Sequence, residues 1–90
     1  MQLNIKYTSQ FKKDYKRCKK RNYNLLDLES VIKILIQNKT LPYKYKDHIL
    51  IGNYNGRREC HLAPDWLLIY KIERNTIILE RTGSHSDLFK

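Results

Sequence analysis

Apolar side chains occupy every second position at the start of the chain. Leu3, Ile5 and Tyr7 alternate with polar residues. This spacing predicts a half-buried strand over residues 2–7, because successive side chains of a strand point to opposite faces.

Two stretches with helical spacing follow this strand. Thr8-Ser9 offers an N-cap for the first, whose apolar stripe is thin and comprises Phe11, Tyr15 and Cys18. Asn24 offers a cap for the second. The second stripe has a period of 3.6 residues and runs through residue 37; it comprises Leu25, Leu28, Ile32, Leu35 and Ile36. We expect an antiparallel helical hairpin with its apolar faces turned onto a sheet.

Strand patterns fill the rest of the chain. Asn55-Gly56 is a strong signal for a two-residue hairpin turn, and Arg74-Asn75 predicts a second hairpin. The tail over residues 84–89 has no assigned element. The predicted strands are 49–53, 57–62, 66–73 and 76–82.

The order of these elements is β-α-α-β-β-β-β. It predicts one α+β domain over residues 1–90, with a mostly antiparallel sheet and the helical hairpin packed on one face. The other face of the sheet is then open for function.

Charge narrows the class of partner. The chain carries 18 basic and 9 acidic residues, a net charge of +9. Such an excess attracts polyanions, so nucleic acid is the first candidate and an acidic protein the second. A solvated helix face without a dedicated partner is the plainer alternative. The basic residues are densest on the first helix, where we expect RNA-binding by Lys12, Lys13, Lys16 and Lys19.

Other classes are disfavoured. No apolar run approaches the roughly 20 residues that span a bilayer, so no membrane association is expected. Cys18 and Cys60 form no CxxC pair and indicate free thiols in a cytoplasmic protein. The spacing of Cys and His matches no zinc finger, and we expect neither a metal site nor a cofactor.

Candidate chemistry lies in the second half. His48, His61 and His85 fall at or near predicted strand ends, and Asp65 follows a proline corner. A two-residue turn at Asn55-Gly56 places Leu50 opposite His61, so that His48 and His61 share a face. Histidine titrates near neutrality, which suits proton transfer. Satisfied structural histidines are the alternative.

Three further side chains are candidates for binding RNA. Arg81 suits a phosphate clamp. A two- or four-residue turn at Arg74-Asn75 puts it on the same face as Leu68 and Tyr70, whereas a three-residue turn puts it on the other face. A surface salt bridge, to Glu59 or Glu80, is the alternative for Arg81. Trp66 and Phe89 suit base stacking, with core packing as the alternative for each.

Histidines, a carboxylate and an arginine without a metal motif point to a metal-free ribonuclease. In that reaction a base removes the proton of the ribose 2′-hydroxyl and the oxyanion attacks the adjacent phosphorus. An acid then protonates the leaving 5′-oxygen.

Three blocks, "YKDHIL" (45–50), "RECHLAPDWLLIYKI" (58–72) and "LERTGSHSDLF" (79–89), resemble the YafQ-type branch of the RelE toxins. The resemblance extends over nearly the whole chain. It implies a RelE-like fold and a ribosome-dependent, metal-independent messenger-RNA endonuclease that a cognate antitoxin neutralises. The active-site positions that it implies are His48, His61, Asp65, Trp66, Arg81, His85 and Phe89.

Roles within this site stay open. We favour His85 as general base, with His48 or His61 as acid, Asp65 as their partner and Arg81 on the phosphate. A basic module that binds RNA or protein without catalysis, or a gyrase-directed relative on the same scaffold, are the alternatives.

Overall fold

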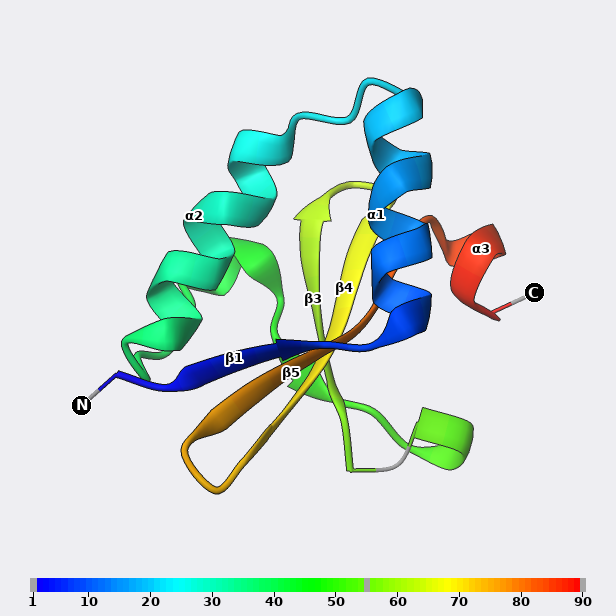
Figure 1. Cartoon of the computed structure of the whole chain (residues 1–90). Coiled ribbons are helices and arrows are strands. Elements are labelled where there is room, and N and C mark those ends of the chain that lie inside the picture. Colours follow the sequence, from blue (N-terminus) through cyan, green and yellow to red (C-terminus); the bar gives the residue numbers. More distant parts are fainter. Residues whose placement is uncertain (1, 55, 90) are drawn as a thin grey trace.

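A twisted sheet of five strands organises the part of the chain that the structure describes, residues 2–54 and 56–89 of a computed structural model (Figure 1). Its elements, with η for a 3₁₀ helix, are β1 (Asn4–Tyr7), α1 (Ser9–Lys20), α2 (Leu25–Ile36), η1 (Tyr43–Tyr45), β2 (His48–Ile49), η2 (Gly52–Tyr54), β3 (Arg58–Ala63), β4 (Trp66–Glu73), β5 (Thr76–Gly83) and α3 (His85–Phe89). The predicted α+β class is confirmed, and so is the predicted order β-α-α-β-β-β-β, to which the structure adds η1, η2 and α3.

The strand order is β1-β5-β4-β3-β2. Neighbouring strands are antiparallel except β1 and β5, which run parallel with Asn4 opposite Thr76. The mostly antiparallel sheet is therefore confirmed. The parallel pair places β1 beside the last strand of the chain, β5, and makes β1 an edge strand.

Both predicted N-caps are present. The Thr8 hydroxyl accepts a hydrogen bond from the Phe11 backbone N–H at 2.9 Å, and the Asn24 side chain accepts one from the Leu26 N–H at 3.2 Å. Each cap satisfies a backbone donor that the first helical turn leaves free.

α1 and α2 cover one face of the sheet (Figure 1). Their apolar stripes, joined by every second residue of β3 and β4, form the main core, which includes Phe11, Cys18, Leu28, Val31, Leu35, Cys60, Leu62, Trp66, Leu68 and Tyr70. The intervening strand residues face the other side, where Leu67 and Ile69 form a smaller cluster with Leu88. None of the described helices is long and apolar enough to cross a membrane.

Of the two predicted hairpins, one has the predicted register and the other does not. Glu73 lies opposite Thr76, so Arg74 and Asn75 form the expected two-residue turn, with left-handed φ values of 49° and 62°. The other register is wrong: His48 lies opposite Glu59, and the Leu50 N–H donates to the Arg57 carbonyl at 2.8 Å.

The wrong register follows from a loop that is longer than predicted. β2 ends at Ile49, and the chain then turns through η2 in place of the predicted strand over residues 49–53. Asn55, half of the predicted turn, lies outside the described residues. The register differs by four residues from the predicted one, an even number, so His48 and His61 still share a face.

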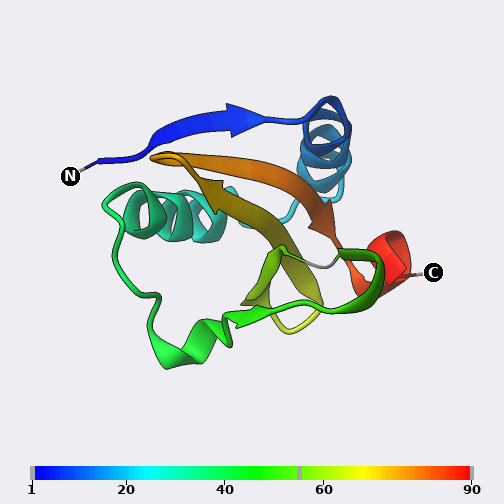
Figure 2. The same ribbon diagram turned by 90° about the horizontal axis from the view of Figure 1, so that it is seen from below.

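The C-terminal tail, left without an element by the sequence analysis, is the short helix α3. Ser84 and Asp87 cap it reciprocally: each backbone N–H donates to the other's side chain, at 2.9 and 3.2 Å. The segment from η1 to η2 runs below the sheet and ends beside α3 (Figure 2). The Tyr54 hydroxyl there donates to the Leu88 carbonyl at 3.4 Å.

Candidate active site

Three imidazole rings lie in a row on the sheet face opposite α1 and α2. The ring centroids of His48 and His61 are 6.4 Å apart, and those of His61 and His85 are 6.0 Å apart. Phe89 extends the row, at 6.4 Å from His85. Residues from β2, β3 and α3 therefore meet at one place, although they are up to about 40 positions apart in the chain.

His85 and Asp65 form a hydrogen-bonded pair. The His85 Nδ1 lies 2.7 Å from Asp65 Oδ1, which also accepts the His85 backbone N–H at 3.0 Å. The backbone bond and then the ring bond hold the pKa of Asp65 below its ordinary value. An ionised carboxylate only accepts hydrogen bonds, so Nδ1 carries the proton and Nε2 of the neutral ring is left as a base.

His48 is oriented by its own loop. Its Nδ1 lies 2.7 Å from the Lys46 carbonyl oxygen, so Nδ1 is the donor and Nε2 points away from the loop. The preceding residue, Asp47, accepts hydrogen bonds from Arg58 and from the Tyr70 hydroxyl. Burial, followed by the bond to Asp47, raises the pKa of Tyr70. The loop is thus tied to β3 and β4 immediately before His48.

His61 is the least exposed of the three histidines, with 23% of its side chain accessible. Burial lowers its pKa, and the carboxylate of Glu59 partly opposes this effect. Glu59 lies two positions earlier on β3, on the same face, and is 5% exposed. Sequence reasoning considered Glu59 only as a partner for Arg81 and missed its place between histidines.

Arg81 does not lie where the register predicted. A β-bulge between Ile69 and Tyr70 shifts the pairing, so Arg81 lies opposite Ile69 on the histidine face and not with Leu68. Its guanidinium binds neither Glu59 nor Glu80 but Asp14 on α1: Nε lies 2.7 Å from Oδ2. This bond raises the pKa of Arg81.

Asp14 has no exposed surface, and several donors converge on its carboxylate. It accepts hydrogen bonds from Arg17 at 2.9 Å and from the Thr82 backbone N–H at 3.2 Å, in addition to Arg81. Burial raises the pKa of Asp14, but the bonds from Arg81 and Thr82 outweigh it, so the pKa is lowered on balance. The carboxylate thus accepts a backbone N–H of β5 at Thr82, beyond the point where β1 ends and leaves that edge of β5 without a neighbouring strand.

The two aromatic candidates for base stacking, Trp66 and Phe89, differ in exposure. Trp66 is 3% exposed, packs edge-on against Tyr23 and donates its indole N–H to Thr82 at 2.8 Å. Trp66 therefore shows the core packing that was its alternative. Phe89 is 45% exposed and packs against Tyr54, leaving much of its surface open to a base.

A cavity of about 450 Å³ adjoins His61. Lys44 and Lys46 contribute positive charge to its wall, and Asp27 contributes the acidic side chain. The cavity therefore meets the row of rings at His61.

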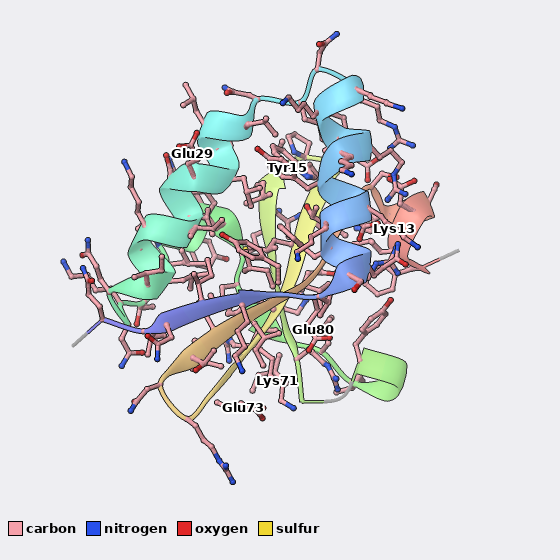
Figure 3. The ribbon with its side chains drawn as sticks, viewed as in Figure 1. Lys13, Tyr15, Glu29, Lys71, Glu73 and Glu80 are labelled. Carbon is pink, nitrogen blue, oxygen red and sulfur yellow. The ribbon has the colours of Figure 1, made fainter. Side chains whose placement is uncertain are left out.

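The four candidate lysines do not share one surface. Lys12, Lys16 and Lys19 line a groove of about 690 Å³ between α1 and α2, whose floor includes Tyr15. Lys13 projects from the other side of α1, away from Tyr15 (Figure 3). All four are on α1, and none of them lines the cavity beside His61.

Among the described residues, no group of three or more His, Cys, Asp or Glu side chains is placed to hold a metal ion. Cys18 and Cys60 are both free and buried, and burial raises the pKa of each thiol. Neither cysteine is placed to act as a nucleophile.

Comparison with known proteins decides the family. A family model described as "Bacterial toxin of type II toxin-antitoxin system, YafQ" matches residues 3–90. The chain belongs to this family. It is 42% identical over 90 residues to the mRNA interferase toxin YafQ of Escherichia coli K12, covering 99% of this chain and 98% of the relative.

Solved structures agree with the YafQ assignment. The fold matches YafQ in the E. coli DinJ-YafQ toxin-antitoxin complex with a TM-score of 0.92 and 42% identity, covering 100% of both chains. A metal-bound toxin from Helicobacter pylori matches with a TM-score of 0.90 and 45% identity, over 97% of this chain and 99% of that chain. The RelE-like arrangement implied by the sequence blocks is confirmed.

Proposed function

We propose that this member of the YafQ family is the toxin of a type II toxin–antitoxin pair and that it cleaves messenger RNA on the ribosome. The name of the E. coli relative supports the activity. The observation that carries the proposal for this chain is the Asp65–His85 pair, set in a row with His61 and His48. It brings several groups that can transfer protons together on one face of the sheet.

Cleavage needs a base and an acid. His85 is the base: Asp65 holds its Nδ1–H, so Nε2 removes the proton of the ribose 2′-hydroxyl. The new oxyanion attacks the adjacent phosphorus. His48 or His61 gives a proton to the departing 5′-oxygen, leaving a 2′,3′-cyclic phosphate and a 5′-hydroxyl.

Charge develops on the phosphate during this step. Arg81 uses Nε and Nη2 for Asp14, so a phosphate is bound through the remaining edge of the guanidinium. Phe89 stacks a base beside His85, and Lys46 attracts the backbone near His61. Electrostatic stabilisation of this kind is a large part of phosphoryl-transfer catalysis.

We also propose that the toxin acts in the cytoplasm, where a cognate antitoxin protein covers and neutralises the candidate active site. A structure of the E. coli relative is described as a DinJ-YafQ complex. The net charge of +9 favours an acidic partner.

The test is induction of the protein followed by primer extension on cellular messages. We expect new 5′ ends within translated regions for the wild type and for Ser86→Ala, a matched control on the exposed neighbour. His85→Ala should give none while still binding ribosomes. Intact messages with arrested translation would support a binding module, and intact messages with arrested replication a gyrase-directed toxin.

A further inference from the structure

Glu59 lies between two of the active-site histidines. Its Oε1 is 3.4 Å from the Nε2 of His48 and 3.7 Å from the Nε2 of His61. The same carboxylate oxygen therefore faces both rings. Each distance exceeds that of a short hydrogen bond, so the carboxylate is shared between the two rings and not committed to either.

This position follows from the strand pairing. His48 is directly opposite Glu59 across the β2–β3 ladder, and directly opposite side chains project to the same face. His61 is two positions further along β3 and faces the same way. The two histidines flank Glu59 because of the observed register; the register predicted from the sequence does not bring Glu59 beside His48.

Burial makes the contact costly to leave unsatisfied. The Glu59 side chain is 7% exposed, whereas 49% of His48 is exposed. An ionised carboxylate in such a place requires a positive or hydrogen-bonding partner. Within the described part of the chain, the structure records the two imidazoles beside this carboxylate, and each forms an ion pair with it only when protonated.

The tautomer of His48 determines which form of its ring can be a partner for the Glu59 carboxylate. Its Nδ1–H is committed to the Lys46 carbonyl. A neutral His48 ring therefore turns the lone pair of Nε2 toward the carboxylate, which is repulsive. A proton on Nε2 converts the contact into an attraction.

The groups around His61 determine how readily its ring takes up a proton. Burial lowers the pKa of His61, and positive charge on Lys46, His85 and His48 acts in the same direction, while Glu59 opposes them. His61 is therefore disfavoured as the charged ring.

We propose that Glu59 is a positioning residue that joins His48 and His61 into one proton-sharing unit, so that a proton given up by either ring is held against the same carboxylate. The inference about catalysis rests on the proposed ribonuclease function. The bridge itself concerns the free protein and is tested without RNA.

The first experiment is NMR titration of the histidine rings in the free protein. Glu59→Gln keeps the size of the side chain and removes its charge. We expect the titration midpoints of His48 and His61 to fall by about one pH unit, the usual effect of losing an adjacent opposite charge. His85, paired with Asp65, should keep its midpoint.

Two variants complete this experiment. Glu29→Gln removes an equal charge from an exposed position on α2 and should shift no histidine. Glu59→Asp keeps the charge on a shorter side chain, so the midpoints of His48 and His61 should fall less than in Glu59→Gln. Unchanged midpoints of His48 and His61 in Glu59→Gln overturn the bridge.

The second experiment measures single-turnover cleavage on programmed ribosomes as a function of pH. In Glu59→Gln we expect one limb of the pH–rate profile to move to lower pH by about the shift seen in the NMR titration. An alkaline limb that moves identifies the pair as acid, and an acidic limb as base. A uniform fall in rate with both limbs in place overturns the positioning role.

The two proposals fail separately. If the midpoints shift but the wild type cuts no message, the bridge stands and the ribonuclease function falls. If the wild type cuts messages and the midpoints do not shift, the ribonuclease function stands and Glu59 has no positioning role.

Discussion

Replacing Asp14 with Asn tests whether one buried carboxylate supports Arg81 and the edge of β5. The change removes the charge that binds Arg81 and Arg17, although an amide oxygen can still accept the Thr82 N–H. Breaking a buried ion pair costs about 3–5 kcal/mol. The two arginines are 22% and 34% exposed and regain some water, so we expect a loss of about 2–3 kcal/mol.

Urea unfolding and thermal melts measure this loss. For a domain of this size, 2–3 kcal/mol corresponds to a fall of roughly 10–20 °C in Tm. Glu29→Gln, an exposed change of the same charge, should stay within about 0.5 kcal/mol of the wild type.

The stabilisation that Asp14 provides should also depend on pH. The folded-state pKa of Asp14 lies below its unfolded value. Its contribution is therefore complete above about pH 4 and is lost as the pH falls through the lowered folded value. The difference between wild type and Asp14→Asn should narrow in that direction. A constant difference from about pH 6 to 3, or equal stability at neutral pH, would refute the reasoning.

Three further outcomes are expected. His85→Ala should slow single-turnover cleavage about 10²–10⁴-fold and displace a limb of the pH–rate profile. Arg81→Lys should cost about 10–100-fold with the limbs in place, because it loses the planar fork but no group that titrates near neutrality. Lys12, Lys16 and Lys19 changed together to Glu should weaken ribosome binding steeply at low salt and little at high salt in filter-binding assays; unchanged binding at low salt would assign the groove between α1 and α2 to another partner.

Local patterns predicted most of the architecture. The caps at Thr8 and Asn24 and the turn at Arg74-Asn75 depend on residues next to one another in the chain, and all three are confirmed. The helix α3 was missed, although Ser84 and Asp87 have the spacing of a capping box and were visible in the sequence.

Long-range geometry accounts for the rest. The bulge that turns Arg81 to the histidine face arises in the pairing of β4 with β5, and the parallel pairing of β1 needs the finished sheet. The histidine face was predicted because alternation survives an even error in register. The neighbour of His48 was not, since alternation says which face a side chain is on and nothing about what lies beside it.

The pairing of β1 with β5 has a consequence for the moment at which the protein becomes complete. Of the described elements, β1 is synthesised before the helices and the other strands, whereas the strand beside it, β5, which carries Arg81, is the last of the strands, and His85 and Phe89 follow it in α3. Contacts between such distant segments form slowly and only after both exist. A nascent chain whose β5 has not yet left the exit tunnel therefore has an unpaired first strand and an unfinished site. Under the proposed function, a toxin molecule becomes active only after β5 and α3 have both emerged from the ribosome that makes it.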